Sequence, residues 1–430
     1  MAMVVKNNMS AISTLNTLNK NSSALSKSLQ KVSSGMKING AADDASGYAI
    51  SERMRVQIRG LDQANQNTQN GSSMMKVAEG AVSSTVDILK TLKEKVINAA
   101  NDTNTDADRQ TIQKELDQSI DQINDNANVT YNGKYLVDGS HNSKVTATTT
   151  SMTNQSLNTE TEFASTFTAL TDRNGNSLNI QSSDTITLSY VKEGKTKTIS
   201  VSGASTLTNL INEVSTDIKT GEATSVIGKD VAGDTVYTAD GKSAITLTAA
   251  GSGVESQISG ITLSVTDTKG NVKKSANALL DNFSESIRAQ NKSNDNSINL
   301  QVGTKSNQAI KVGLTDMRAE ALGLQAKDGT TLNISTKDYA NAAINVLDNA
   351  VQKALDQQTT IGAVQSRLEY TSSNLTTASE NVQSSESTIR DADMAKEMTN
   401  YTKNNVLMQA AQAMLSQANQ SSSSVLSLLQ

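Results

Sequence analysis

The sequence predicts an α+β protein with a long helical coiled-coil or bundle core built from both chain ends and an inserted, mainly β outer domain. Three observations predict it. Apolar residues recur at heptad spacing at both ends of the 430-residue chain. The segments next to these ends keep helical periodicity, whereas residues 141–296 are rich in Thr, Ser, Gly and Asn and alternate like strands.

The N-terminal stripe follows positions that are alternately three and four residues apart. Its nine positions are Asn8, Ala11, Leu15, Leu18, Ser22, Leu25, Leu29, Val32 and Met36. All of them except Asn8 and Ser22 are apolar. A basic, amphipathic N-terminus is also typical of an organelle transit peptide or a membrane-surface helix. A matching stripe at the other end argues against both, because such signals need no distant partner.

The C-terminal stripe repeats every seven residues. Its members are Met394, Tyr401, Met408, Leu415, Ser422 and Leu429, and Ala411, Ala418 and Val425 lie beside it. A helix of about 30 residues is roughly 45 Å long, and its apolar face must be covered. We therefore expect the two ends to pair. The chain has no Pro, so nothing forces a kink.

Helical periodicity continues inside both ends. On the N-terminal side a break at residues 101–105 separates two runs: Ile50, Met54, Ile58, Leu61, Met75, Ala78, Val82, Val86 and Leu89, then Ile112, Leu116, Ile120 and Ile123. On the C-terminal side residues 340–389 form one run: Ile344, Leu347, Val351, Leu355, Leu368, Leu375, Val382 and Ile389.

The middle of the chain contains strand signals. Residues 185–191 and 198–201 alternate, and Glu193-Gly194-Lys195 between them predicts a hairpin. Residues 244–248 and 261–266 repeat the pattern, with a short helix expected at 206–218. We find no catalytic constellation in this module.

Composition excludes several classes of protein. Without Cys the chain has no disulfide, thiol nucleophile, iron–sulfur cluster or Cys-rich zinc site. His141, the single His, excludes a HExxH site and lies in a polar loop context. Apolar residues 2–5 are too few for a signal core or membrane span. We expect no enzyme activity, cofactor, nucleic-acid partner or membrane insertion.

Charge separates the ends from the middle. Residues 1–40 hold five Lys and no acid, and residues 401–430 hold one Lys and no acid. The other 360 residues carry a net charge of −11, which with the basic ends gives the whole chain a net charge of −5. The acidic pairs Asp43/Asp44 and Asp391/Asp393 are interpreted as helix-start caps or solvated faces rather than as metal or acid–base sites.

Two sets of motifs resemble bacterial flagellin. Residues 33–50 read Ser-Ser-Gly-Met-Lys-Ile-Asn-Gly-Ala-Ala-Asp-Asp-Ala-Ser-Gly-Tyr-Ala-Ile and are followed by Arg53 and Gly60-Leu61. Towards the other end, residues 362–369 read Gly-Ala-Val-Gln-Ser-Arg-Leu-Glu and residues 390–394 read Arg-Asp-Ala-Asp-Met. The resemblance covers about residues 1–140 and 297–430 and leaves 141–296 unmatched.

The resemblance implies three domains. Residues 1–40 with 401–430 would form the terminal coiled coil of the filament's inner core. Residues 41–140 with 297–400 would form a helical bundle with a short β-hairpin, and residues 141–296 a variable, surface-exposed, mainly β domain.

The resemblance also implies a function. The chain would be a structural subunit that polymerises into the extracellular flagellar filament for motility. It would leave the cell unfolded through the flagellar type III export system, and its partners would be further copies, an export chaperone, the filament cap and hook–filament junction proteins. Alternatives are a hook–filament junction protein and an adhesin on a flagellin framework.

Residues in the stripes are expected to carry polymerisation, because a lone pair of thin helices leaves an apolar seam uncovered. The candidates are Leu15, Leu18, Leu25, Leu29, Val32, Met408, Leu415, Val425 and Leu429. Purely intramolecular packing is the alternative role.

Some flagellins contact an animal Toll-like receptor through an Arg, a Leu and a Glu. The resemblance places these contacts at Thr91, Lys95 and Glu115, two of which depart from the family pattern. We therefore expect only weak receptor activation.

Overall fold

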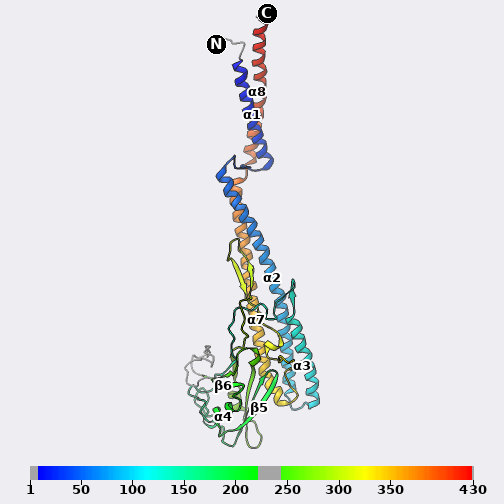
Figure 1. Cartoon of the computed structure of the whole chain (residues 1–430), viewed down its shortest axis with the longest axis vertical. Helices are drawn as coiled ribbons and strands as arrows, with labels where there is room; N and C mark the ends of the chain where they lie inside the picture. Colours follow the sequence, from blue (N-terminus) through cyan, green and yellow to red (C-terminus); the bar gives the residue numbers. More distant parts are fainter. Residues whose placement is uncertain (1–7, 221–243, 429–430) are drawn as a thin grey trace. The chain divides into compact units, whose positions relative to one another are not determined.

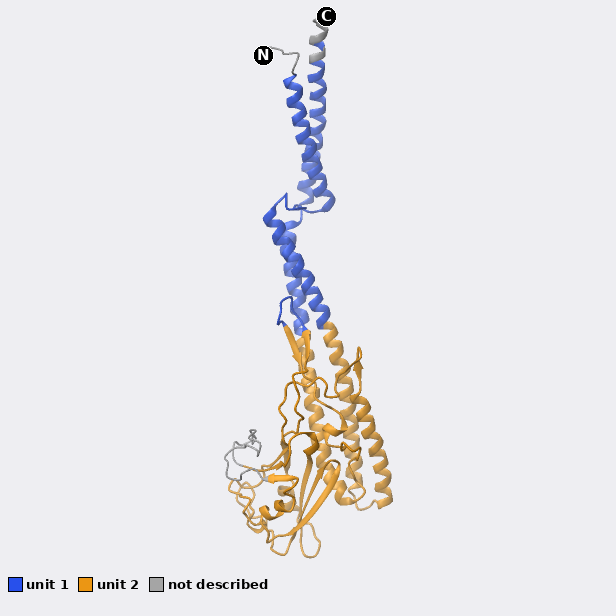
Figure 2. Ribbon diagram, viewed as in Figure 1, with its two compact units in different colours: residues 1–68, 301–308, 370–430 blue, residues 69–300, 309–369 orange. Residues whose placement is uncertain are grey.

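The computed structural model describes residues 8–220 and 244–428. They fall into two compact units, coloured separately in Figure 2. Unit 1 comprises residues 1–68, 301–308 and 370–430, and unit 2 comprises residues 69–300 and 309–369. The helices α2 (Ala45–Ala99) and α7 (Lys337–Arg390) each contribute residues to both units.

Unit 1 contains the two terminal helices, α1 (Met9–Ser34) and α8 (Met394–Leu428), which run side by side (Figure 1). The Asn8 side chain caps α1 by accepting a hydrogen bond from the Ala11 backbone N–H at 3.1 Å. Gly35 ends α1 with φ of 69°, a left-handed conformation that favours glycine. The predicted helices at both chain ends, and their pairing, are confirmed.

The rest of unit 1 is a second helix pair, formed by residues 45–68 of α2 and 370–390 of α7. A small apolar cluster of Leu61, Ala64 and Leu375 joins them. The partly buried Ala378 and Val382 pack against this cluster, and Ser372 Oγ donates to Asn65 Oδ1 at 2.6 Å. This pair therefore has a thin core.

Unit 2 has a helical layer made of residues 69–99 of α2, α3 (Asp106–Ala127) and residues 337–369 of α7. The predicted break between α2 and α3 is confirmed, and Thr105 and Asp108 form a reciprocal capping box there. Of the apolar positions predicted here, Ile112 is half-buried and the others are buried: Met75, Ala78, Val82, Val86, Leu89, Leu116, Ile120 and Ile123. Unlike unit 1, this layer has a continuous core.

The predicted apolar face of α7 is partly wrong. Leu347 and Leu368 are buried as expected, but Leu355 is exposed. The helix instead buries a neighbouring face that contains Ala343, Val346, Ala350 and Ala354. The small alanine side chains let other elements approach this face closely. This face is therefore buried, although the predicted face carries larger apolar side chains.

The inserted module contains two antiparallel sheets, in strand orders β6-β7-β3-β9 and β5-β4-β8. Their strands are β3 (Ser151–Asn154), β4 (Thr185–Lys192), β5 (Lys195–Ser202), β6 (Ile218–Thr220), β7 (Ile245–Ala249), β8 (Ile258–Thr266) and β9 (Phe283–Ile287). The predicted β4–β5 hairpin is confirmed, and both turn residues, Glu193 and Gly194, have positive φ. The helix expected at 206–218 is wrong in length: α4 (Leu207–Asn212) ends six residues early, and β6 begins at Ile218.

The remaining elements are short. They are the hairpins β1 (Thr130–Tyr131) with β2 (Lys134–Tyr135) and β10 (Ile298–Gln301) with β11 (Ala309–Val312), and the helices α4 (Leu207–Asn212), α5 (Lys274–Leu280) and α6 (Ala319–Leu322).

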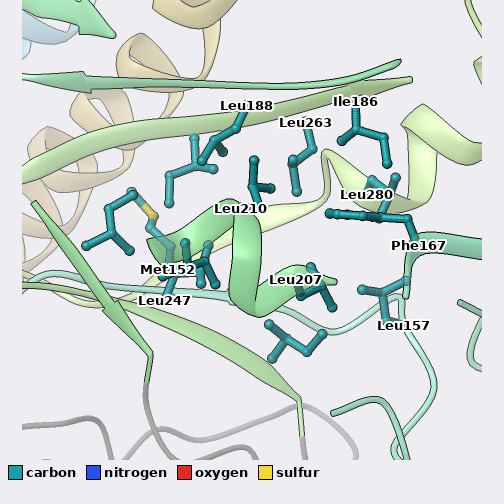
Figure 3. Close-up of a cluster of buried hydrophobic side chains, with 14 of the residues drawn as sticks. Met152, Leu157, Phe167, Ile186, Leu188, Leu207, Leu210, Leu247, Leu263 and Leu280 are labelled. Carbon is teal, nitrogen blue, oxygen red and sulfur yellow. The ribbon is translucent and has the colours of Figure 1, made fainter. Parts of the chain in front are cut away.

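Side chains from both sheets meet in one core. Figure 3 shows Leu207 and Leu210 of α4 in one cluster with Leu188 and Leu263 of one sheet and Met152 of the other. Each of these five side chains is buried. The insert therefore has a core of its own.

The insert is attached to α7 by backbone contacts and buried charges. A Cβ atom on Gly260 of β8 would lie 3.0 Å from the Val346 backbone nitrogen, so any larger residue there would push β8 and α7 slightly apart. Asn349 Nδ2 donates to the Ser259 carbonyl at 2.9 Å. The buried Lys353 ammonium lies 3.4 Å from the Glu285 carboxylate of β9. Unit 2 thus combines the insert and the helical layer in one body.

Asp281, which follows α5, makes the stability of unit 2 depend on pH. Burial raises the pKa of Asp281 to about 6, against hydrogen bonds that favour its charged form. The folded state therefore binds a proton at the Asp281 carboxylate more tightly than the unfolded state does. The free energy of unfolding should fall as pH rises from about 4 to 6.

We predict that Asp281→Asn raises the stability of unit 2 at pH 8 by about 1–2 kcal/mol, allowing for partial exposure of the group. At pH 3.5 the effect should be close to zero. Thermal unfolding followed by circular dichroism at both pH values measures it, with the exposed Asp121→Asn as control. An equal effect at both pH values would contradict the assigned titration.

Candidate functional site

The terminal helices meet along a seam that repeats every seven residues. The positions along it are half-buried or buried: Ala11, Thr14, Leu18, Asn21, Leu25, Ser28 and Val32 on α1, and Tyr401, Asn404, Met408, Ala411, Leu415 and Ala418 on α8. We call these residues the α1–α8 seam. Asn8 contacts Ala418 and Asn404 contacts Ser28, so the helices are antiparallel.

The seam buries little apolar surface. In the 26 residues of α1 the only buried residue is Ser28, and among the described side chains of α8 the only one is Ala411. Burial of apolar area is the main favourable term in folding. The terminal pair on its own therefore lacks a hydrophobic core.

A second apolar stripe lies outside the seam on each helix. On α1, Leu15 is 45% exposed and Leu29 is 51% exposed; on α8, Leu407 and Met414 are 42% and 63% exposed. The members of a stripe are separated by one or two heptads, so they share a face of their helix. We call these four residues the outer stripes.

The structure divides the predicted polymerisation residues between these two surfaces. Leu18, Leu25, Val32, Met408 and Leu415 lie in the seam, whereas Leu15 and Leu29 lie in an outer stripe. Val425 belongs to α8, but its side chain lies outside the described part, as does all of Leu429. Leu407 and Met414 were missed because they fall between the positions of the predicted stripe.

Amide side chains bridge the seam where a coiled coil normally carries apolar residues. Asn21 Nδ2 donates to the Leu407 carbonyl at 3.2 Å. Asn404 Nδ2 donates to Ser28 Oγ at 3.1 Å and to the Ala24 carbonyl at 3.5 Å. Asn8 Nδ2 donates to the Ala418 carbonyl at 3.2 Å.

The base of the terminal pair is held by Arg390, the last residue of α7. Its side chain is buried, and its Nη1 donates to the Glu52 carboxylate at 2.6 Å. The guanidinium lies 5.3 Å from the centre of the Tyr48 ring. The Arg390 and Gly35 carbonyls accept hydrogen bonds from Lys37 and Ala392, which ties the end of α1 to the start of α8.

The acidic pairs serve helix starts and loops. Asp44 accepts from the Gly47 N–H at 3.0 Å, and Asp393 accepts from the Ala395 N–H at 3.0 Å. The capping interpretation is confirmed for these two residues. Within residues 8–220 and 244–428, no group of three or more His, Cys, Asp or Glu side chains could hold a metal ion. No helix there is long and apolar enough to cross a bilayer.

Comparison with known proteins agrees with this arrangement. Residues 5–142 match the family model of the bacterial flagellin N-terminal helical region, and residues 344–429 match that of the C-terminal helical region. A flagellin of Clostridium tyrobutyricum is 36% identical over 423 residues, covering 97% of this chain and 99% of the relative. The chain belongs to the flagellin family.

Two further relatives match over the same extent. A flagellin of Bacillus subtilis is 30% identical and covers 99% of this chain and 100% of the relative. A flagellar filament 33 kDa core protein of Treponema phagedenis is 29% identical, with the same two coverages. Both the terminal pair of this flagellin and its insert therefore lie within the matched length.

The three positions at which the resemblance predicts receptor contacts lie on unit 2. Thr91 and Lys95 are on α2 and Glu115 is on α3, and the Lys95 ammonium pairs with the Glu115 carboxylate at 3.0 Å. Thr91 donates its hydroxyl to the Asp87 carbonyl of its own helix. Two of the three positions are thus brought into contact, and an ion pair occupies both side chains.

Proposed function

We propose that this chain is a structural subunit of a bacterial flagellar filament, and that copies of it polymerise through the terminal helices. The observation that carries the proposal is the lack of a core in the α1–α8 pair, beside exposed apolar stripes on both helices. The names of the relatives, flagellin and filament core protein, support the same conclusion.

A second copy of this chain is the proposed occupant of the outer stripes. The α1 stripe consists of leucines and the α8 stripe of Leu407 and Met414, so the two surfaces are different. Joining different surfaces of successive copies gives a head-to-tail contact, and such contacts produce open helices when the rotation does not close.

Ordering of the terminal helices should accompany polymerisation. A helix with one partner loses conformational entropy while it buries little apolar area, so the pair is marginal in the free subunit. Weakly ordered ends suit export of an unfolded chain through the flagellar type III system to an extracellular filament. The absence of Cys prevents oxidative cross-linking there.

The remaining partners follow from the same surfaces. Before assembly the exposed apolar residues of α8, including Val406 and Leu407, need cover, which an export chaperone would provide. The filament cap and the hook–filament junction proteins would meet the same terminal helices at the two ends of the polymer. In this proposal the chain acts structurally rather than as an enzyme.

We predict that Leu29→Asp abolishes filament growth without unfolding unit 2. Full burial of a leucine contributes about 1.5–3 kcal/mol, and Leu29 has 51% of its surface left to bury, so loss of this contact raises the critical concentration by roughly 4- to 12-fold. A buried carboxylate adds a further penalty. Electron microscopy and sedimentation measure growth, and circular dichroism measures the fold.

The matched control is Gln30→Asp, which adds the same charge to the adjacent exposed position. It should leave the critical concentration within about threefold of that of the unchanged chain, because each 1.4 kcal/mol corresponds to tenfold. Normal filaments from Leu29→Asp would refute the outer stripes as contacts between copies.

We also predict that amide hydrogen exchange separates free and assembled chains. In the free chain, the backbone amides of α1 and α8 should exchange far faster than those of residues 75–89 of α2. That part of α2 packs in the core of unit 2 through the buried side chains of Met75, Val82 and Leu89. Assembly should slow exchange in α1 and α8 by at least about 100-fold. Equal protection of α1 before and after assembly would rule out coupled ordering.

We further propose that this chain activates the Toll-like receptor only weakly. The Lys95–Glu115 ion pair engages two of the three contact positions, and Lys95 is charged where the family pattern is apolar. We expect Lys95→Leu combined with Thr91→Arg to strengthen the response in reporter cells by tenfold or more. A response of the unchanged chain equal to that of a flagellin with the family pattern would contradict this prediction.

A further inference from the structure

Two different faces of α1 could pack against α8. Both contain Ala11, Leu18, Leu25 and Val32, which repeat every seven residues. The intervening positions distinguish the two faces: Thr14, Asn21 and Ser28 on the face that forms the seam, and Leu15, Ser22 and Leu29 on the other. A rotation of α1 by roughly 50° about its axis would exchange them.

Hydrophobic burial alone favours the face that is not used. It would place Leu15 and Leu29 in the seam, where Thr14 and Ser28 now lie. For an isolated pair this exchange buries more apolar surface. Another interaction must therefore hold α1 in its observed orientation.

We propose that Asn21 and Asn404 select the orientation of α1 and so keep Leu15 and Leu29 on the outside for a neighbouring copy. Asn404 lies in the α8 seam, where its amide donates to Ser28 and to the Ala24 carbonyl. After the rotation this amide would face leucine side chains and lose its acceptors, and a desolvated amide without a partner is costly.

Asn21 acts from the opposite helix. Its amide donates to the Leu407 carbonyl, and the rotation would carry it away from α8. Polar residues in coiled-coil seams specify register and partner at the expense of stability. These asparagines would likewise keep the terminal pair weak in the free chain and its leucines available. This inference rests on the proposed filament function.

The test compares Asn404→Leu with Asn405→Leu in the full chain. Asn405 is also half-buried, and its side chain accepts from Gln409 on its own helix. We expect Asn404→Leu to slow amide exchange of α1 in the free chain by at least tenfold and to slow elongation of short wild-type filaments by at least tenfold. Asn405→Leu should change neither by more than about twofold.

A single introduced thiol reports the orientation directly, because the chain has no Cys. In the free Asn404→Leu chain, a thiol from Leu29→Cys should react with a maleimide at least tenfold more slowly than one from Gln30→Cys. Without Asn404→Leu, the two thiols should react within threefold of each other.

The outcomes distinguish the proposed role of Asn404 from the proposed filament function. If Asn404→Leu elongates filaments at the wild-type rate, or speeds exchange in α1 as simple loss of a hydrogen bond would, the selector role is overturned. Equal reactivity of the two thiols in the Asn404→Leu chain overturns it as well. If the unchanged chain fails to elongate filaments, the filament function fails, and the thiol comparison still decides whether Asn404 orients α1.

Discussion

The terminal helices of this chain bury few of their own apolar side chains when they pair. The division of the molecule into a weakly packed and a well-packed part depends on that constraint. A pair of helices offers each one only a single contact face. Here that face contains one buried residue on α1, Ser28, and one among the described side chains of α8, Ala411. The free energy needed to order some sixty residues must come from elsewhere, because backbone ordering alone costs about 1–2 kcal/mol per residue.

Unit 2 has the opposite character. Its helical layer has a continuous core, and the insert has another that joins two sheets and α4. The close approach at Gly260 and the hydrogen bond from Asn349 to β8 attach the insert to α7. A body with these cores can fold by itself, so its stability need not depend on neighbouring copies. Residues 141–296 contribute none of the residues of the α1–α8 seam or of the outer stripes.

The sequence predicted the long helices, the break between α2 and α3, and the β4–β5 hairpin, because turns and periodicity are local signals. It could not decide which face of α1 meets α8, since Ala11, Leu18, Leu25 and Val32 belong to both candidate faces. Apolar counting favoured Leu15 and Leu29, which the structure leaves exposed. The same counting misjudged α7, where Ala343 and Ala350 are buried and Leu355 is not. In both helices the packing partner, rather than side-chain size, decides the face.

Exposure of the leucines on α1 is therefore informative rather than anomalous. A pattern that scores a helix by its apolar residues counts every contact that the helix will make, including contacts with other copies. A single chain satisfies only some of them. The predicted stripe on α1 mixes residues of the seam, such as Leu18 and Leu25, with residues of the outer stripe, Leu15 and Leu29. The part of the pattern that one subunit leaves unsatisfied marks the surface on which the next subunit would pack.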